Sequence, residues 1–95
     1  MRAYFIFQEE ISDKEAFEEY KKMSPESIKK YGGEFVVRGG DVEVIEGVFD
    51  FERVAILAFP SFEQARAWYN SEEYAEAKEL RLKISKCQAI LVQGI

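Results

Sequence analysis

The alternation of apolar and polar residues predicts strands near both ends of the chain and in its middle. Residues 2–8 (RAYFIFQ) are aromatic and β-branched, and both alternating faces are apolar, which is typical of a strand. Residues 53–59 (RVAILAF) show the same two-sided pattern and end at Pro60, so we expect the central strand here. Residues 86–92 (KCQAILV) predict the last strand of the sheet.

Helical spacing replaces the strand pattern after the first of these segments. Ser12, followed three residues later by Glu15, is a typical N-cap for a helix. Ser24 and Pro25 then repeat the pattern of an N-cap and a first helical residue, so we expect the helix to break and restart there. The inward-facing positions of the two pieces are Ala16, Phe17, Tyr20, Met23, Ile28 and Tyr31.

A second helical region follows the predicted central strand. Ser61 and Gln64 form a capping box at its start, and Asn70 interrupts the helix. Ser71 then caps a further segment whose first turn is acidic, as the positive end of a helix favours. The residues at helical spacing in this region are Phe62, Ala65, Trp68, Tyr69, Tyr74, Ala77, Leu80, Arg81 and Ile84.

Residues 31–40 (YGGEFVVRGG) connect the first helical region to the sheet. The glycine pair 32–33 supplies the left-handed turn that ends a helix, so the residues after it predict a strand. Arg38 is a cation among the apolar residues of this strand, and we expect it to be buried. A bulge or turn at the glycine pair 39–40 is followed by residues 42–47 (VEVIEG), whose pattern predicts that the strand continues.

The predicted order of elements is β-α-β-β-α-β, which is that of the ferredoxin-like α+β fold with a four-stranded antiparallel sheet. We expect residues 1–95 to form a single domain. Right-handed crossovers place both helical regions on the same face of the sheet. The other face would then expose more apolar surface than a soluble monomer usually shows. We therefore expect a homodimer in which two sheets pack face to face.

Composition and charge narrow the range of partners. The chain has 47% hydrophobic and 33% charged residues, as a soluble globular protein does, and a net charge of -5. This charge disfavours nucleic acid as a partner, and no basic patch is evident in the sequence. The first ten residues contain too short an apolar run for a signal peptide or a membrane span, so we expect a cytoplasmic protein. The single cysteine, Cys87, agrees with a reducing compartment.

The chain contains no histidine. This absence removes the usual proton shuttle near neutral pH and the commonest metal ligand. It also excludes Ser-His-Asp and Cys-His mechanisms. We predict neither a metal site nor a cofactor.

Several spaced motifs together resemble a known family. They are Tyr31-Gly32-Gly33, residues 35–40 (FVVRGG), residues 42–47 (VEVIEG), Phe59-Pro60-Ser61, Ala67-Trp68-Tyr69, Ser71, Glu73-Tyr74 and Leu80-Arg81. The chain resembles the small bacterial family called domain of unknown function 1330, and it departs from the usual family pattern at Glu34, Ala58 and Glu72. The resemblance implies a dimeric α+β barrel, in which two ferredoxin-like units pack sheet to sheet.

The wider superfamily that this resemblance implies is functionally diverse. It includes cofactor-free oxygenases, haem-degrading enzymes, muconolactone isomerases, stress-response proteins and amino-acid-sensing domains. Because one fold serves so many functions, the resemblance does not select a reaction. Haem degradation is the least favoured of these functions, since the chain has no histidine to serve as an axial ligand.

Arg38 is the first candidate for ligand binding. A guanidinium holds a carboxylate through two parallel hydrogen bonds, so Arg38 would form an anion clamp in a cleft between the sheet and the helices. The alternative is a structural ion pair with Glu34, Glu43 or Glu46. Glu43 and Glu46 would act as a catalytic base only if burial raised the pKa of either carboxyl, and most glutamates on an edge strand are solvated.

Four aromatic residues form the second group of candidates: Tyr31, Trp68, Tyr69 and Tyr74. They would wall an aromatic pocket and offer hydroxyl donors, or they would be ordinary core residues. Arg81 would reach the same cleft, or it would pair with Glu73, Glu76 or Glu79 on the helix surface. Cys87 is expected to be a structural thiol because no second cysteine or histidine accompanies it.

The sequence therefore predicts a homodimer that binds a small organic ligand, for example a carboxylate, near Arg38, Tyr31 and Trp68. The alternative is a cofactor-independent monooxygenase or isomerase that acts on a small organic substrate. The sequence leaves open whether the protein is an enzyme.

Overall fold

A computed structural model describes every residue from Met1 to Ile95. Its elements are β1 (Ala3–Ile11), α1 (Lys14–Lys30), β2 (Glu34–Arg38), β3 (Arg53–Phe59), α2 (Phe62–Tyr69), α3 (Glu72–Ile84) and β4 (Ser85–Gln93). This is the predicted β-α-β-β-α-β order, with the second helical region divided into α2 and α3 at Asn70 and Ser71. The predicted α+β ferredoxin-like fold is confirmed.

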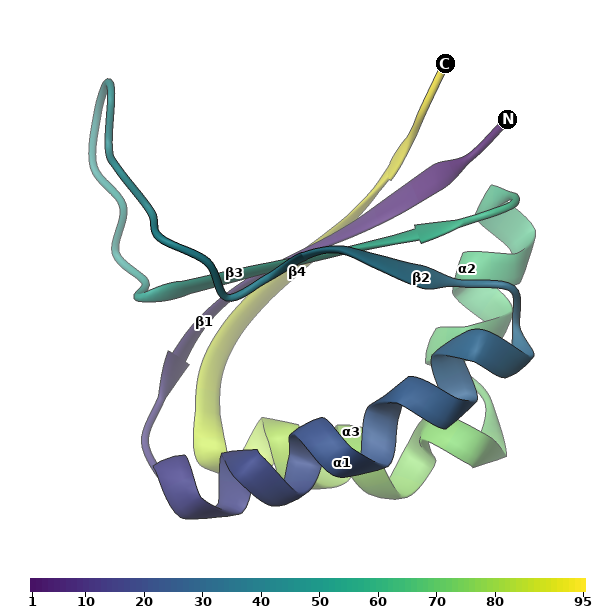
Figure 1. The fold of residues 1–95 in the computed structure, drawn as a ribbon, viewed down its shortest axis with the longest axis horizontal. Helices are drawn as coiled ribbons and strands as arrows, with labels where there is room; N and C mark the ends of the chain where they lie inside the picture. Colours follow the sequence, from purple (N-terminus) through teal and green to yellow (C-terminus); the bar gives the residue numbers. More distant parts are fainter.

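The four strands form one antiparallel sheet in the order β2-β3-β1-β4. Strands β1 and β3 are central, as the two-sided apolar patterns of both segments indicate. Phe7 on β1 lies opposite Ala55 on β3 and Ala89 on β4. The three helices lie on one face of this sheet, and the termini and the loop between β2 and β3 project from the other side (Figure 1).

The hydrophobic core lies between the sheet and the helices. Every second residue at the start of β1 (Ala3, Phe5 and Phe7) is buried against the helices, which is the two-residue period of a strand. Trp68 of α2 is completely buried, and its ring centroid lies 4.1 Å from that of Tyr74 on α3. Trp68 also contacts Phe5 edge to face. Aromatic packing therefore holds α2 and α3 on the sheet.

Helix α1 differs from the prediction at both its start and its middle. Its N-cap is Asp13, whose carboxylate accepts a hydrogen bond from the Ala16 amide at 3.1 Å. Ser12 instead donates to the carbonyl of Ile84 at 2.8 Å and so joins the start of α1 to the end of α3. The predicted break at Pro25 is wrong, because α1 continues through this residue to Lys30.

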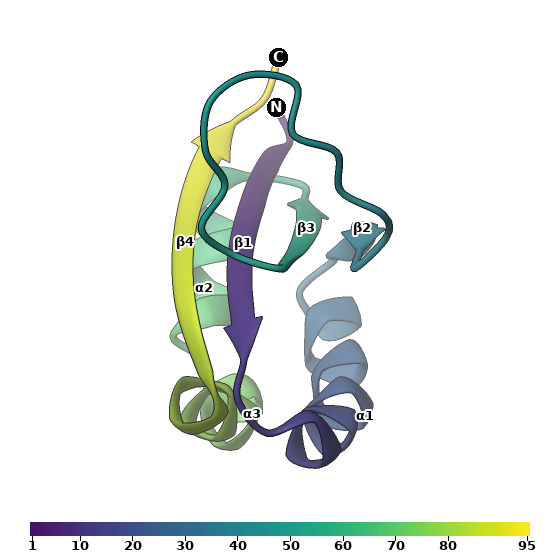
Figure 2. The same cartoon turned by 90° about the vertical axis from the view of Figure 1, so that its left-hand side faces the viewer.

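Residues 39–52 form a loop that leaves the body of the molecule, and the predicted strand at 42–47 is wrong (Figures 1 and 2). Gly39 has a φ of +72° and turns the chain away from the edge of β3. An alternating pattern becomes a strand only where a neighbour pairs with it, and this loop has no neighbour. Ile45 and Val48 are 80% and 87% exposed. The loop is attached at its ends, where Gly39 donates to Val54 and Glu52 donates to Glu9 through backbone hydrogen bonds.

The face of the sheet opposite the helices, which we call the outer face, is apolar and carries no helix (Figure 1). Its side chains include Tyr4, Ile6, Val37, Ile56, Ile90 and Val92, which are half-buried or exposed. None of the three helices is long and apolar enough to cross a membrane.

Candidate functional site

A small cavity lies between α1 and the end of the sheet formed by β2 and β3. Its volume of about 20 Å³ is enough for about one water molecule. Its apolar wall consists of Phe7, Ile28, Phe35, Ala55 and Leu57. Its polar lining consists of Glu9, Tyr20, Lys21, Ser24, Arg38 and Arg53. We call this space the inner cavity.

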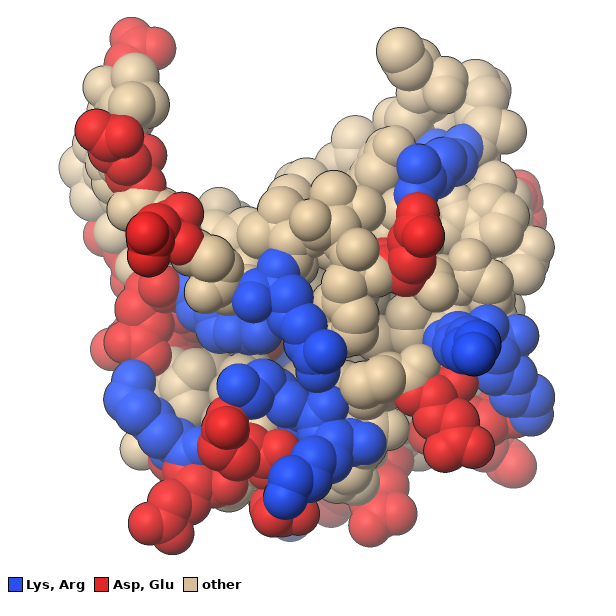
Figure 3. Space-filling model, in the orientation of Figure 1, with Lys and Arg blue, Asp and Glu red and all other residues tan.

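A wider hollow of about 390 Å³ adjoins the inner cavity, and Lys21 and Arg53 border both. We call this hollow the mouth. Lys14 lies on its rim together with Glu18 and Glu52. Lys and Arg side chains gather on this side of the molecule (Figure 3). Acids lie among these cations, and Glu18 binds Lys21 at 2.7 Å, so folding brings together cations that are far apart along the chain without forming a purely basic patch.

Local structure explains why these residues meet. Glu9 continues the inward alternation of β1, and its cross-strand partner on β3 is Arg53. Tyr20, Ser24 and Ile28 are four residues apart on α1 and therefore lie on one face of the helix. The two-residue period of β1 and the helical period of α1 therefore place these residues on the side of each element that faces the cavity.

Strand β2 needs an irregularity to reach the same cavity. Phe35 and Arg38 are three residues apart, so a regular strand would turn them to opposite faces. The register shifts between Phe35 and Val37, and this bulge at Val36 returns Arg38 to the face of Phe35. The guanidinium of Arg38 lies 4.2 Å from the centre of the Phe35 ring. Both side chains therefore line the cavity.

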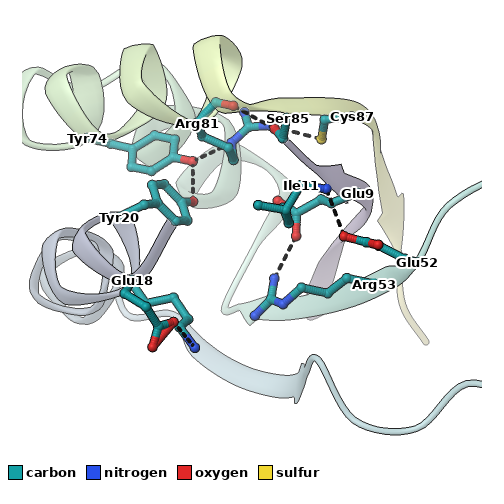
Figure 4. A network of polar contacts seen from close by, with 11 residues as sticks. Glu9, Ile11, Glu18, Tyr20, Glu52, Arg53, Tyr74, Arg81, Ser85 and Cys87 are labelled. Atoms are coloured by element: carbon teal, nitrogen blue, oxygen red, sulfur yellow. Dashed lines mark hydrogen bonds and ion pairs between the residues drawn. The ribbon is translucent and has the colours of Figure 1, made fainter. Parts of the chain in front are cut away.

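Glu9 and Arg53 form a buried ion pair on one side of the cavity (Figure 4). Arg53 Nη1 donates to Glu9 Oε1 at 2.6 Å, and Glu9 is only 2% exposed. The guanidinium of Arg53 also lies over the ring of Phe17 at 4.8 Å. The second carboxylate oxygen of Glu9 makes no hydrogen bond with another side chain. The pair is held in place by packing, while one oxygen of Glu9 stays free.

Arg38 is exposed, so the expectation that it is buried is wrong. It pairs with none of the predicted acids: Glu34 binds Arg2 at 2.6 Å, and Glu43 and Glu46 lie on the projecting loop. Instead, Arg38 Nη2 donates to the backbone carbonyl of Lys21 at 3.0 Å.

Pro25 explains why the carbonyl of Lys21 is available to Arg38. In an α-helix this carbonyl would accept the amide hydrogen of residue 25, but proline has none. Arg38 supplies the missing donor from β2 and so bridges the sheet and α1 beside the inner cavity. The bridge allows the helix to continue through Pro25.

A buried hydrogen-bonded chain lies behind the cavity and consists of Tyr20, Tyr74, Arg81 and Cys87 (Figure 4). The two tyrosine hydroxyls are 2.7 Å apart, and Arg81 Nε donates to the Tyr74 hydroxyl at 3.1 Å. Arg81 Nη1 lies 2.9 Å from Cys87 Sγ. Burial raises the pKa of both tyrosines and of the Cys87 thiol, so all three groups are neutral near pH 7.

Arg81 is 1% exposed, and the predicted pairing with Glu73, Glu76 or Glu79 is wrong. Its guanidinium lies 5.1 Å from the centre of the Phe7 ring, which also lines the inner cavity. Arg81 therefore reaches the region behind the cavity through Tyr74 and Phe7.

The predicted aromatic residues lie elsewhere. The indole of Trp68 is buried in the core and donates to Ser27 Oγ at 3.1 Å. Tyr69 stacks on Phe5. Tyr31 donates to Glu73 at 3.0 Å on the surface, where Lys30 binds the same carboxylate. None of these lines the inner cavity, and their role in ligand binding stays a prediction; of the predicted residues, Arg38 alone lines it.

The sequence did not identify five polar members of the site: Glu9, Tyr20, Lys21, Ser24 and Arg53. The signal for Glu9 was its parity with Phe5 and Phe7, because an acid at an inward position of a strand must be paired. Nothing in the sequence alone indicates that Arg53 is its partner, since that depends on the register of β1 and β3.

Comparison with solved structures supports this fold. A protein of unknown function from Rhodopseudomonas palustris is 18% identical with a TM-score of 0.79, and the match covers 99% of this chain and 82% of that one. A dimeric ferredoxin-like protein of unknown function from Jannaschia sp. CCS1 is 13% identical with a TM-score of 0.75, over 99% and 100% of the two chains. SnoaB, a cofactor-independent oxygenase from Streptomyces nogalater, is 10% identical with a TM-score of 0.67, over 99% and 93%.

At these identities the likeness concerns the fold alone. No curated protein matches the chain. The family model described as "Domain of unknown function (DUF1330)" matches residues 2–95. The resemblance found in the spaced sequence motifs is thereby confirmed, and the chain belongs to the DUF1330 family.

Proposed function

We propose that the protein binds a small organic anion, such as a carboxylate, in the cleft formed by the mouth and the inner cavity. One observation carries this proposal: Lys21, Arg38 and Arg53 converge on a cavity with an apolar wall, in a chain whose net charge is -5. Small-molecule sites typically combine an apolar wall with a few convergent polar groups.

Spare guanidinium donors favour an anion at the mouth, where Lys21 and Lys14 are already paired with Glu18 and Glu52. Arg53 uses Nη1 for Glu9, and Arg38 uses Nη2 for the Lys21 carbonyl, so each guanidinium keeps further N–H donors. A carboxylate near Lys21 would accept charge-assisted hydrogen bonds from these donors. The apolar part of the ligand would then lie against Phe35.

A thermal-shift screen with small carboxylates tests this function. Binding should raise the melting temperature of the native protein, and Arg38→Ala should reduce the affinity about tenfold or more through loss of charge-assisted bonds. Arg66→Ala is the matched control, because Arg66 also lies over a ring, Phe62, at 4.8 Å but does not line the cleft. Equal affinity in the Arg38 variant and the native protein would contradict the proposal.

Cofactor-independent oxygenation or isomerisation is the second candidate function. The observation that favours it is the buried Glu9 carboxylate beside the phenol of Tyr20, since a base and a hydroxyl donor are what proton transfer at carbon requires. The fold shared with SnoaB is in keeping with it. Turnover of any acid that passes the binding screen, abolished in Glu9→Gln, would support this second function.

We also propose that the outer face binds the outer face of a second copy of the chain. Its exposed apolar residues, which include Ile90 at 50% exposure, support this, and the similar structure from Jannaschia is dimeric. Sedimentation should show a particle of two chains, and Ile56→Glu on the outer face should shift it to one. A native particle of one chain's mass would contradict the homodimer.

We propose the cytoplasm as the location of the protein. The support is that Cys87 is a free thiol with no partner for a disulfide, as expected in a reducing compartment. Fractionation of cells that express the tagged protein would test this.

A further inference from the structure

We infer that Tyr20 donates its hydroxyl hydrogen to a ligand oxygen in the inner cavity, so that the preferred ligands are carboxylates with a second, uncharged oxygen, such as oxo acids or hydroxy acids. This inference rests on the proposed function and names the class of anion that the same cleft selects.

The hydroxyls of Tyr20 and Tyr74 together carry one hydrogen more than the hydrogen bond between them uses. The hydroxyls of Tyr20 and Tyr74 are 2.7 Å apart and share one hydrogen bond, so only one of their two hydrogens is used between them. Arg81 Nε donates a further hydrogen to the Tyr74 oxygen, and a guanidinium cannot accept one in return. One hydroxyl hydrogen is therefore left for another acceptor.

Burial decides which tyrosine keeps that hydrogen. If Tyr20 donated to Tyr74, the spare hydrogen would be on Tyr74, which is completely buried and has no further acceptor. An unsatisfied buried donor is costly. If Tyr74 donates to Tyr20, all groups of Tyr74 are satisfied, and the spare hydrogen is on Tyr20, which lines the cavity. The donors then run from Arg81 through Tyr74 to Tyr20, and each polarises the next.

Two more polar groups in the inner cavity are without side-chain partners. Ser24 is 3% exposed and its hydroxyl makes no hydrogen bond, and the second oxygen of Glu9 is also free. Three buried residues with polar side chains, Tyr20, Ser24 and Glu9, therefore line one cavity (Figure 4 shows Tyr20 and Glu9). This supports a polar ligand group at the inner end of the cleft.

The size of the inner cavity and the charge of Glu9 limit which ligand group can lie there. The inner cavity accepts only a tip of one or two atoms, which fits a carbonyl or hydroxyl oxygen. A second carboxylate there would face the negative charge of Glu9, so dicarboxylates should bind less well than oxo acids. The carboxylate would remain at the mouth beside Lys21 and Arg53.

Matched pairs of acids test the inference by calorimetry. Suitable pairs are 2-oxobutanoate with butanoate, phenylpyruvate with 3-phenylpropanoate, and salicylate with benzoate. The native protein should prefer the oxygen-bearing member about five- to tenfold, as one neutral hydrogen bond allows. Tyr20→Phe should remove this preference. Tyr4→Phe, which removes a hydroxyl on the outer face, should keep the preference.

A second measurement does not depend on a variant. The infrared band of a ¹³C-labelled ketone carbonyl in 2-oxobutanoate should lie at lower frequency in the native protein than in a solvent that donates no hydrogen bond, because a hydrogen bond weakens the carbonyl bond. Equal binding of both members of each pair, or a preference that survives in Tyr20→Phe, would overturn this inference and leave the proposed function standing. Failure of all six acids to bind the native protein would overturn both.

Discussion

At the scale of single residues, two ion pairs of the same length differ in burial and therefore in their expected contribution to stability. Glu9 and Arg53 lie 2.6 Å apart inside the molecule, and Glu34 and Arg2 lie 2.6 Å apart on its surface. Water screens the charges of the exposed pair from each other. Removal of one partner of the buried pair leaves the other charge unpaired, with little water around it. Distance alone therefore says little about the contribution of an ion pair to stability.

This contrast predicts unequal effects of two truncations. Glu9→Ala should lower the free energy of unfolding by about 3 kcal/mol, because it leaves Arg53 unpaired beside the cavity. Glu34→Ala should change it by less than about 1 kcal/mol. Urea unfolding of both variants would measure this, and similar values for the two would show that the Glu9 pair is effectively solvated.

The stability of the protein should depend on pH through the Glu73 carboxyl. Hydrogen bonds from Lys30 and from Tyr31 lower the pKa of the Glu73 carboxyl to about 2. Because the folded pKa lies below the unfolded one, the contribution to stability is full above about pH 4.5 and disappears as the pH falls to about 2. The melting temperatures of the native protein and Glu73→Gln should therefore converge over this interval. A difference between the two proteins that stays constant over this interval would contradict the prediction.

At the scale of elements, α1 depends on a side chain from the sheet. Pro25 removes the donor for the Lys21 carbonyl, and Arg38 on β2 replaces it at 3.0 Å. The bulge at Val36 is what turns Arg38 to the helix. The hydrogen bond from Arg38 to the Lys21 carbonyl therefore depends on the bulge in β2 and supports the continuous helix α1.

A double-mutant cycle tests this coupling. Arg38→Ala should cost about 1 kcal/mol in the native background, because the Lys21 carbonyl loses its donor. In Pro25→Ala the helix supplies its own N–H, so the same substitution should cost less than half as much. Chemical unfolding of the four proteins gives the coupling energy. A value near zero would mean that Arg38 does not support α1.

The loop 39–52 is the element with the least support. Backbone hydrogen bonds hold it only near Gly39 and Glu52, and Val48 is 87% exposed. A protease that cuts after glutamate should therefore cleave first at Glu43 or Glu46, and mass spectrometry of the early fragments would show this. First cleavage at one of the exposed helical glutamates would contradict this assignment.

At the scale of the whole molecule, the order of elements could be predicted but the site could not. The two-sided patterns of residues 2–8 and 53–59 identify central strands. A strand that is covered on both faces has apolar residues on both alternating faces, and this pattern is visible within its own segment. The site joins Glu9, Tyr20 and Arg53 from three elements, and their meeting depends on register and on a bulge that no local pattern reveals. The segment 42–47 failed for the opposite reason: its local pattern was clear, but no neighbouring strand was present to pair with it.

The geometry of the loop 39–52 also has a practical use. Gly47 has a φ of +82° and no atom close enough to hinder an added group, and it lies far along a segment that contributes nothing to the core. A fluorescent protein or an affinity tag spliced into the chain at this glycine should be carried clear of the body without disturbing the fold. The protein thus offers an internal attachment point for labels that leaves both chain ends untouched.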